Sequence, residues 1–193
     1  NGVRFLAEQI DSILRQTIDD FELIVADDCS TDTTPSLLHA YAERDPRVRL
    51  VLNKNNVGLN RNLENVLRLA RGHFVAISDQ DDIWHPDKLE RLLEGIGNHS
   101  AAYCDSLLVD AAGQSLGVTL LQRMRLTSPP RDGGAVALLR KNCVSGHALL
   151  FRRELLDLAL PFDPRLMFDQ QLGFFAAINN GLVYVNRAPV HHR

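Results

Sequence analysis

The chain has 193 residues, enough to bury the core of one globular domain. Hydrophobic residues make up 45% and charged residues 23%, and the net charge of -3 argues against nucleic-acid binding, because no basic stripe is present to neutralise phosphates. The apolar runs are far shorter than the roughly 18 residues that a membrane span requires.

The first hundred residues alternate between helical and strand patterns. Strands are predicted over about 21–28, 48–52 and 73–78, and helices over about 3–17, 34–44, 59–70 and 86–96. This alternation predicts an α/β fold in which a mostly parallel sheet carries helices on both faces. Because the pattern begins on a helix, we expect the sheet to lack its first, central strand in this sequence.

Beyond residue 100 strands and helices no longer alternate regularly in the predicted pattern. We nevertheless expect the chain to form one domain over 1–193. Strands are predicted over 101–110, 114–121, 147–151 and 182–190, helices over 152–160 and 169–180, and a loop over 123–134.

Two of the predicted strands end in acidic residues at the carboxyl edge of the sheet, where open α/β sheets bind ligands. These residues are Asp27, Asp28, Asp79, Asp81 and Asp82. Crowded carboxylates repel one another unless a cation joins them. Mg²⁺ or Mn²⁺, held by one or two of these acids and by a substrate diphosphate, would relieve the repulsion. In the alternative interpretation, some of the acids cap the helices that follow.

Four blocks of the sequence, in order, resemble glycosyltransferase family 2. They include the runs FELIVADDCSTDTT, SDQDDIWHPDKL, SGHALLFRR and FDQQLGFF. The DQDDIW run is similar to bacterial rhamnosyltransferase-like members that build surface polysaccharides. The resemblance implies the GT-A fold, with a nucleotide-binding half over about 1–100 and an acceptor and catalytic-base half over about 101–193.

The resemblance also implies a set of nucleotide-binding positions. They are Asp27, Asp28, Asp32, Asn60, Arg61, Asn62 and Asp79. Asp28 resembles the acid that accepts a hydrogen bond from the pyrimidine base, and Arg61 lies where its charge would oppose the donor diphosphate.

Metal, sugar and base positions follow from the same resemblance. The DxD element is formed by Asp79 and Asp81, with Asp81 at the usual ligand position, and Asp169 takes the place of the general base. Contacts with the sugar or acceptor are expected from Asp82, Trp84 and His147. For Trp84 core packing is an alternative, and for His147 a buried structural role is another.

Two features qualify this assignment. Many relatives have His or Glu where this chain has Phe168 before the base. Of the adjacent His191 and His192, one could reach the metal, because some relatives use a late histidine, but we interpret the pair as solvated.

The implied activity is an inverting, metal-dependent hexosyl transfer from a nucleoside-diphosphate-sugar to a saccharide or a lipid-linked saccharide. We expect a cytoplasmic protein, with peripheral association at the inner face of the membrane. Alternatives are a non-catalytic nucleotide-sugar-binding domain and a sugar nucleotidylyltransferase. A phosphoaspartate receiver or haloacid-type phosphatase is disfavoured, because a receiver needs a lysine at a late strand end and the DxDGT run of the phosphatases is missing.

Overall fold

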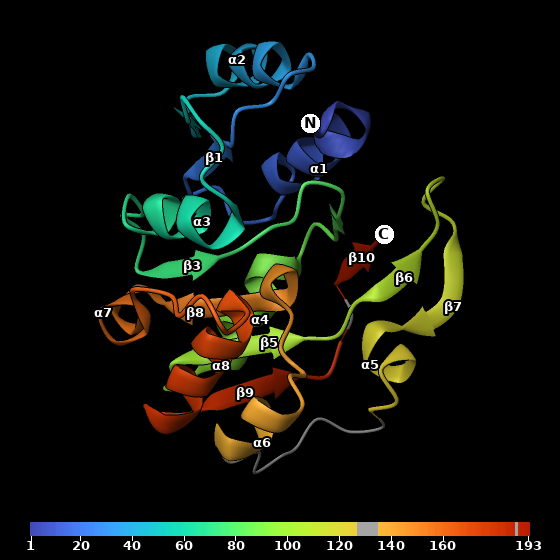
Figure 1. Ribbon diagram of the computed structural model, residues 1–193. Coiled ribbons are helices and arrows are strands. Elements are labelled where there is room, and N and C mark those ends of the chain that lie inside the picture. The colour runs from blue at the N-terminus through green and yellow to red at the C-terminus, as the bar shows by residue number, and fades with distance from the viewer. Residues whose placement is uncertain (127–134, 188) are drawn as a thin grey trace.

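The N-terminal layer consists of a short parallel sheet and two helices. The computed structural model describes residues 1–126, 135–187 and 189–193. Strands β1 (Leu23–Asp27) and β2 (Val48–Leu52) pair in parallel, and helices α1 (Val3–Leu14) and α2 (Thr34–Arg44) pack beside them (Figure 1). Apolar side chains at helical spacing on α1, among them Leu6 and Ile10, meet α2 and β2 in one small core.

A four-stranded mixed sheet forms the centre of the molecule. Its strands lie in the order β3 (Phe74–Ala76), β8 (Leu149–Arg152), β5 (Ala101–Cys104) and β9 (Leu182–Val185). Strand β8 is antiparallel to both β3 and β5, whereas β5 and β9 are parallel.

Helices cover both faces of this sheet because its side chains alternate in direction. Leu149 and Phe151 belong to one core cluster and Leu150 belongs to the other. The first face is covered by α6 (Ala135–Arg140), α7 (Leu156–Ala159) and α8 (Phe168–Ile178), and the second by α4 (Lys88–Ile96) with one end of α1. Helix α3 (Leu59–Leu67) lies beside β3 and contributes its last residue to the first cluster (Figure 1).

A third sheet joins the end of the chain to the segment that follows β3. Its order is β4 (Ile83–Trp84), β10 (Val190–His192), β6 (Leu107–Val109) and β7 (Ser115–Thr119), with α5 (Leu120–Arg123) after it. Strand β10 is antiparallel to β4, with Val190 opposite Trp84, and parallel to β6. This pairing carries residues 190–192 to the acidic segment 79–82.

The α/β class and the helices on both faces are confirmed, but the expected mostly parallel pairing is wrong. Four of the seven pairings between described strands are antiparallel. The second half of the chain returns β8 between β3 and β5, and its direction is set by tertiary packing rather than by local pattern. The single strand predicted over 182–190 is in fact β9 and β10, in different sheets.

Further expectations concern the loop over 123–134, the missing strand and membrane-spanning segments. Of the loop predicted over 123–134, residues 127–134 lie outside the described residues. Strands β1 and β3 belong to different sheets and do not pair with each other, and the missing central strand stays a prediction. None of the helices in the described part of the chain has the length and apolarity needed to cross a membrane.

Candidate active site

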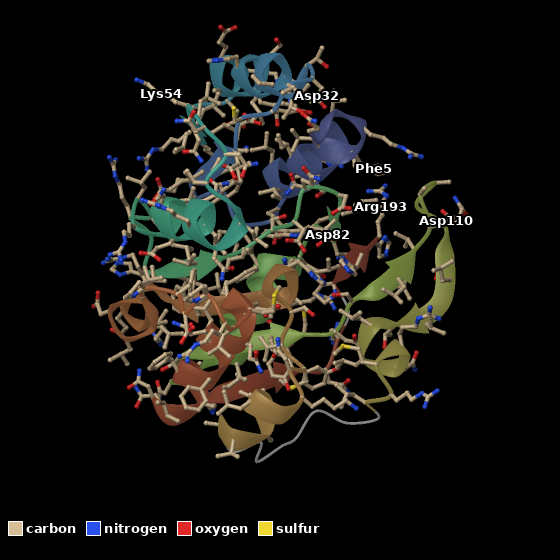
Figure 2. All side chains as sticks on the ribbon, in the orientation of Figure 1. Phe5, Asp32, Lys54, Asp82, Asp110 and Arg193 are labelled. Atoms are coloured by element: carbon tan, nitrogen blue, oxygen red, sulfur yellow. The ribbon has the colours of Figure 1, made fainter. Side chains whose placement is uncertain are left out.

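Four side chains with metal-binding groups meet just past the end of β3. Asp79, Asp82, His147 and His192 each offer one ligand atom, and these atoms lie within 4.8 Å of one another. The Nδ1 atom of His147 lies 3.5 Å from Asp79 Oδ2 and 3.8 Å from Asp82 Oδ2, and Nδ1 of His192 lies 2.7 Å from Asp82 Oδ1. Figure 2 shows Asp82 in the interior, where the N-terminal layer meets the two larger sheets. We call these four residues the Asp–His cluster.

One acidic oxygen of the Asp–His cluster lacks a hydrogen-bond partner among the described residues. Asp82 is fully buried, and its Oδ2 atom has no hydrogen-bond partner among the described residues. An unsatisfied buried polar atom costs about 1–3 kcal/mol, more when it is charged, so the position favours a bound cation. The donor types and this free oxygen therefore fit a divalent metal ion.

Neighbouring groups in the cluster shift the pKa values of His192 and Asp79. The hydrogen bond with Asp82 raises the pKa of His192, and this effect outweighs burial. Burial alone would raise the pKa of Asp79, but its contacts with His147, His192 and Lys88 outweigh burial and lower the pKa. Asp79 is thus held as a carboxylate, the form that binds a metal ion.

A buried lysine lies under the cluster. Lys88 is fully buried, and its Nζ atom donates a hydrogen bond to the backbone oxygen of His147 at 2.6 Å. The same atom lies 3.2 Å from the centroid of the Trp84 ring. Burial lowers the pKa of Lys88 to about 7. Trp84 is itself only 5% exposed, which favours packing over stacking on a sugar.

Asp169 lies in the first turn of α8, held by three donors. Its Oδ1 atom accepts from Asn142 Nδ2 at 3.0 Å and from the Gln170 backbone N–H at 2.7 Å, and its Oδ2 atom accepts from the Gly146 N–H at 3.2 Å. Burial raises the pKa of Asp169, and the negative charge of Asp79 adds to the rise. A carboxylate with a raised pKa is a stronger base, so Asp169 has the environment of a general base beside the cluster.

The approach of α8 to the cluster depends on a glycine. A Cβ atom on Gly146 would lie 2.5 Å from Cε2 of Phe168, closer than real Cβ contacts allow. Gly146 begins the 3₁₀ turn η1 (Gly146–Ala148), which carries His147. The small residue therefore lets the turn that carries His147 pack against the start of α8.

Asp28 has a different environment at the end of β1. Its carboxylate accepts from the backbone N–H groups of Val57 and Gly58, both at 2.9 Å, and from Asn53 Nδ2 at 2.9 Å. These bonds, led by the one from Val57, lower the pKa of Asp28. Asp28 therefore anchors the loop 53–58 as an ionised carboxylate.

The other nucleotide positions surround this loop. Asp27 is buried and accepts from the Ser30 N–H at 2.9 Å, and Asp32 accepts from the Thr34 N–H at 2.9 Å. Neither acid is the N-cap of α2, which is Thr33. Asn62 Oδ1 accepts from Asn53 Nδ2, Asn60 Nδ2 donates to the Leu166 backbone oxygen, and Arg61 is exposed.

Asp79 and Asp81, which the sequence predicts as the DxD metal pair, lie in different environments. Asp79 is in the Asp–His cluster, but the carboxylate of Asp81 is not. The backbone oxygen of Asp81 accepts a hydrogen bond from Arg193, whose guanidinium lies 4.5 Å from the Phe5 ring (Figure 2). Asp82 takes the place beside Asp79, and ligation by Asp81 stays a prediction.

Three residues of the site received too little weight from sequence. The interpretation of His192 as solvated is wrong, since it lies in the Asp–His cluster. The sequence also does not single out Lys88, or Ser106, whose Oγ atom lies 2.7 Å from Nε2 of His147. For Lys88 a signal was present, since it stands at helical spacing with Leu92 and Ile96 on the buried face of α4. A lysine at helical spacing with buried apolar residues indicates that its side chain is buried with them.

Comparison with known proteins identifies the family. Residues 1–158 match the family model described as Glycosyl transferase family 2. The chain belongs to this family. Solved family neighbours share its GT-A fold: TarS of S. aureus in complex with UDP has a TM-score of 0.74 at 21% identity and is matched over 100% of this chain and 57% of its own. A mannosyltransferase from Pyrobaculum calidifontis, in complex with GDP-Man and Mn²⁺, has a TM-score of 0.67 at 23% identity over 97% of this chain and 54% of its own.

Two curated relatives of this family 2 chain are named for polysaccharide biosynthesis in bacteria. The succinoglycan biosynthesis protein ExoO of Rhizobium meliloti is 31% identical over 193 residues, which cover 96% of this chain and 51% of ExoO. A Bacillus subtilis protein named for teichuronic acid biosynthesis is 36% identical over 103 residues, 53% of this chain and 41% of that protein. The chain spans about half the length of these relatives.

Proposed function

We propose that this family 2 chain is the catalytic domain of an inverting, metal-dependent glycosyltransferase of polysaccharide synthesis. It transfers a sugar from a nucleoside-diphosphate donor to a hydroxyl group of a saccharide or lipid-linked saccharide, at the cytoplasmic face of the membrane. The observation that carries the proposal is the placement of a half-buried carboxylate, Asp169, held by three hydrogen bonds, beside a cluster of acids and histidines in which one buried acidic oxygen has no hydrogen-bond partner among the described residues.

Asp169 is the proposed general base. It takes the proton from the acceptor hydroxyl as that oxygen attacks the anomeric carbon in line with the leaving diphosphate. Its three hydrogen bonds fix the carboxylate, and its raised pKa increases its proton affinity during the attack. One displacement inverts the anomeric configuration, so no covalent sugar–enzyme intermediate forms.

The Asp–His cluster is the proposed site of the cation, Mg²⁺ or Mn²⁺. When bound, the ion stabilises the negative charge that grows on the leaving diphosphate. A solved neighbour that binds GDP-Man together with Mn²⁺ supports this role. Arg61, exposed on α3, is proposed to add a second positive charge opposite the diphosphate.

Asp28 and the loop that it anchors form the proposed nucleoside site. The carboxylate has about four lone-pair positions, and its three hydrogen bonds leave room for one more donor, the ring N–H of a pyrimidine base. Neighbour structures with UDP and UDP-GlcNAc support a pyrimidine donor. The sugar itself is proposed to be rhamnose from a thymidine donor, with a uridine-linked hexose as the alternative outcome.

A thermal-shift panel tests the donor. UDP, dTDP, GDP and ADP are each added with and without Mn²⁺, and the largest stabilisation is expected for the pyrimidine diphosphates with metal. Equal shifts for purines and pyrimidines contradict the role of Asp28, and no shift for any nucleotide contradicts the donor class.

The transfer step separates catalysis from simple binding. With a donor that gives a shift, saccharide acceptors are supplied and the product anomer is assigned by NMR. The wild-type protein should form product of inverted configuration, whereas Asp169→Asn should bind the donor and form none. Donor binding without turnover in the wild-type protein, over a broad acceptor panel, favours the non-catalytic nucleotide-sugar-binding alternative.

A further inference from the structure

Lys88 lies where the structure disfavours a positive charge. Its side chain is fully buried, and its hydrogen bond to the described residues goes to a backbone carbonyl rather than to a carboxylate. It is also the first residue of α4, where the helix dipole favours a negative charge. Such departures from the usual rules occur mostly at functional sites, so Lys88 is a candidate for a role in the reaction.

Lys88 and the proposed base, Asp169, come from opposite faces of the central sheet. Helix α4, which carries Lys88, packs on one face, and α8, which carries Asp169, packs on the other. The turn η1 leads directly into β8, the strand that lies between β3 and β5. The turn therefore lies at the end of the sheet, where side chains from both faces reach it.

Lys88 fixes the backbone of this turn from the α4 side. Its Nζ atom donates to the backbone oxygen of His147 at 2.6 Å and lies 3.2 Å from the centroid of the Trp84 ring. The carbonyl and the ring together restrain the end of the side chain. A neutral amine also carries N–H groups, so the hydrogen bond is available whether or not Lys88 is protonated. Because the side chain is fully buried, Lys88 does not contact a substrate directly.

The α8 side of the same turn holds the proposed base. The N–H of Gly146, the residue before His147, donates to Oδ2 of Asp169 at 3.2 Å. This distance is at the long end of the range for N–H···O bonds, so a small shift of the turn would remove the bond. The turn also has little freedom toward α8, since a Cβ atom on Gly146 would lie 2.5 Å from Cε2 of Phe168. The orientation of the Asp169 carboxylate thus depends on where η1 is held.

We propose that Lys88 is a positioning residue for the transfer reaction: its hydrogen bond to His147 holds the turn η1, which keeps the Gly146 N–H directed at the carboxylate of Asp169. Without the amine, the carbonyl of His147 loses its donor and the turn shifts. The carboxylate then loses one of the three hydrogen bonds that orient it. The inference rests on the proposed function only in naming Asp169 as the general base.

The first test removes the donor and keeps the length of the side chain. In Lys88→Met, kcat at saturating donor and acceptor should fall about 10–100-fold, because a displacement of about 1 Å at a catalytic group changes rates by that order. The KM for the nucleotide-sugar should change much less, since Asp28 and the loop 53–58 lie on other elements. An unchanged kcat, or a loss confined to KM, overturns the proposal.

Two further variants separate positioning from charge and from packing. Lys88→Gln removes the charge but keeps an N–H donor, so it should recover part of the kcat that Lys88→Met loses. Ile96→Ala opens a cavity on the same buried face of α4, and it should lower the melting temperature while leaving kcat unchanged. Equal losses of kcat in Lys88→Gln and Lys88→Met, or a similar loss in Ile96→Ala, each assign the effect to charge or packing and overturn the proposal.

The carboxylate of Asp169 provides a readout that needs no turnover. Burial raises the pKa of Asp169 and the Gly146 N–H opposes that rise, so loss of this bond in Lys88→Met should raise the pKa further. The acid limb of the kcat profile should then move to higher pH. Carboxyl ¹³C NMR of the free protein follows the same titration, with the Asp169 signal identified by its absence in Asp169→Asn.

The titration also separates this inference from the proposed function. Ile96→Ala should leave the titration of Asp169 in place, and an unmoved titration in Lys88→Met overturns the proposal. If the titration moves in Lys88→Met but the wild-type protein turns over no nucleotide-sugar, the proposed function fails while the link from Lys88 to Asp169 stands.

Discussion

Acidic residues follow two strands of this chain, β1 and β3, and the acids at the two strand ends have different hydrogen-bond partners. At β1 the acids are matched by donors: Asp28 accepts three hydrogen bonds from the loop 53–58, and Asp27 accepts one from Ser30. After β3, Asp82 is buried with one oxygen unpartnered, and the neighbours of the acids are histidines. A carboxylate saturated by N–H donors holds a loop, whereas a carboxylate short of donors favours a cation.

The largest expected effect comes from the base beside the second acidic end. Asp169→Asn keeps the shape and the packing but removes the proton acceptor, so kcat should fall about 10²–10⁴-fold. Initial rates at saturating donor and acceptor measure the change. Asp157→Asn, an exposed acid on α7, is the matched control and should leave kcat unchanged. A similar kcat for Asp169→Asn and wild type would remove the base from the mechanism.

Lys88 supplies the buried positive charge near the second acidic end, and its ionisation links stability to pH. The folded pKa of about 7 is below the ordinary value of 10.5, so the unfolded chain binds the extra proton between these pH values. The free energy of unfolding should therefore rise with pH across this window, by up to about 1.4 kcal/mol per pH unit from this group.

Urea unfolding of wild type and Lys88→Met at pH 7, 8, 9 and 10 isolates that contribution. The wild-type free energy of unfolding should rise relative to that of the variant as the pH increases. Parallel curves for the two proteins would show that Lys88 keeps an ordinary pKa.

The contrast between the two acidic ends can be measured directly as stability. Asp28→Asn offers one oxygen where two backbone N–H groups and one side-chain amide donate, so the free energy of unfolding should fall. In metal-free protein Asp82→Asn should cost less, because Oδ2 of Asp82 has no hydrogen bond to lose. Asp20→Asn, at an exposed site, serves as the baseline. A greater loss for Asp82→Asn than for Asp28→Asn would reverse the comparison.

The smallest expected effect concerns the pH profile of the base. Asn142 donates to Asp169 and so lowers the pKa that burial raises. Asn142→Ala should raise the pKa of Asp169 further and, because the base acts only when ionised, move the acid limb of the kcat profile to higher pH. A limb that moves to lower pH, or stays in place, would contradict this assignment.

Local sequence pattern was sufficient to predict many of the helices and strands and the two acids of the Asp–His cluster. The predicted bounds of α2 and β2 agree with the structure, because a Thr–Pro helix start and a short apolar run are local signals. Helix α1 begins where its periodicity predicts but ends at Leu14, before the predicted end at residue 17. The direction of β8 and the insertion of β10 between β4 and β6 depend on packing between distant segments, which no window of sequence contains.

The site residues also divide into those that a local sequence signal marks and those whose position depends on the pairing of distant segments. Asp79 and Asp82 follow a strand and could be marked from sequence, since strand ends define one edge. His192 could not be assigned with them, because its place in the cluster depends on the pairing of Val190 with Trp84. His147 was marked for a sugar contact, and its approach to Asp79 and Asp82 became visible only with the turn η1 in place.

The insertion of β10 has a consequence for biogenesis. Asp82 and His192 are separated by 110 positions in the chain, and such distant contacts form only after a large entropic loss of loop closure. A ribosome that has released the first hundred residues has already supplied every atom of the loop around Asp28. The Asp–His cluster can assemble only after residues 190–192 have emerged, because His192 reaches Asp82 through the pairing of β10 with β4.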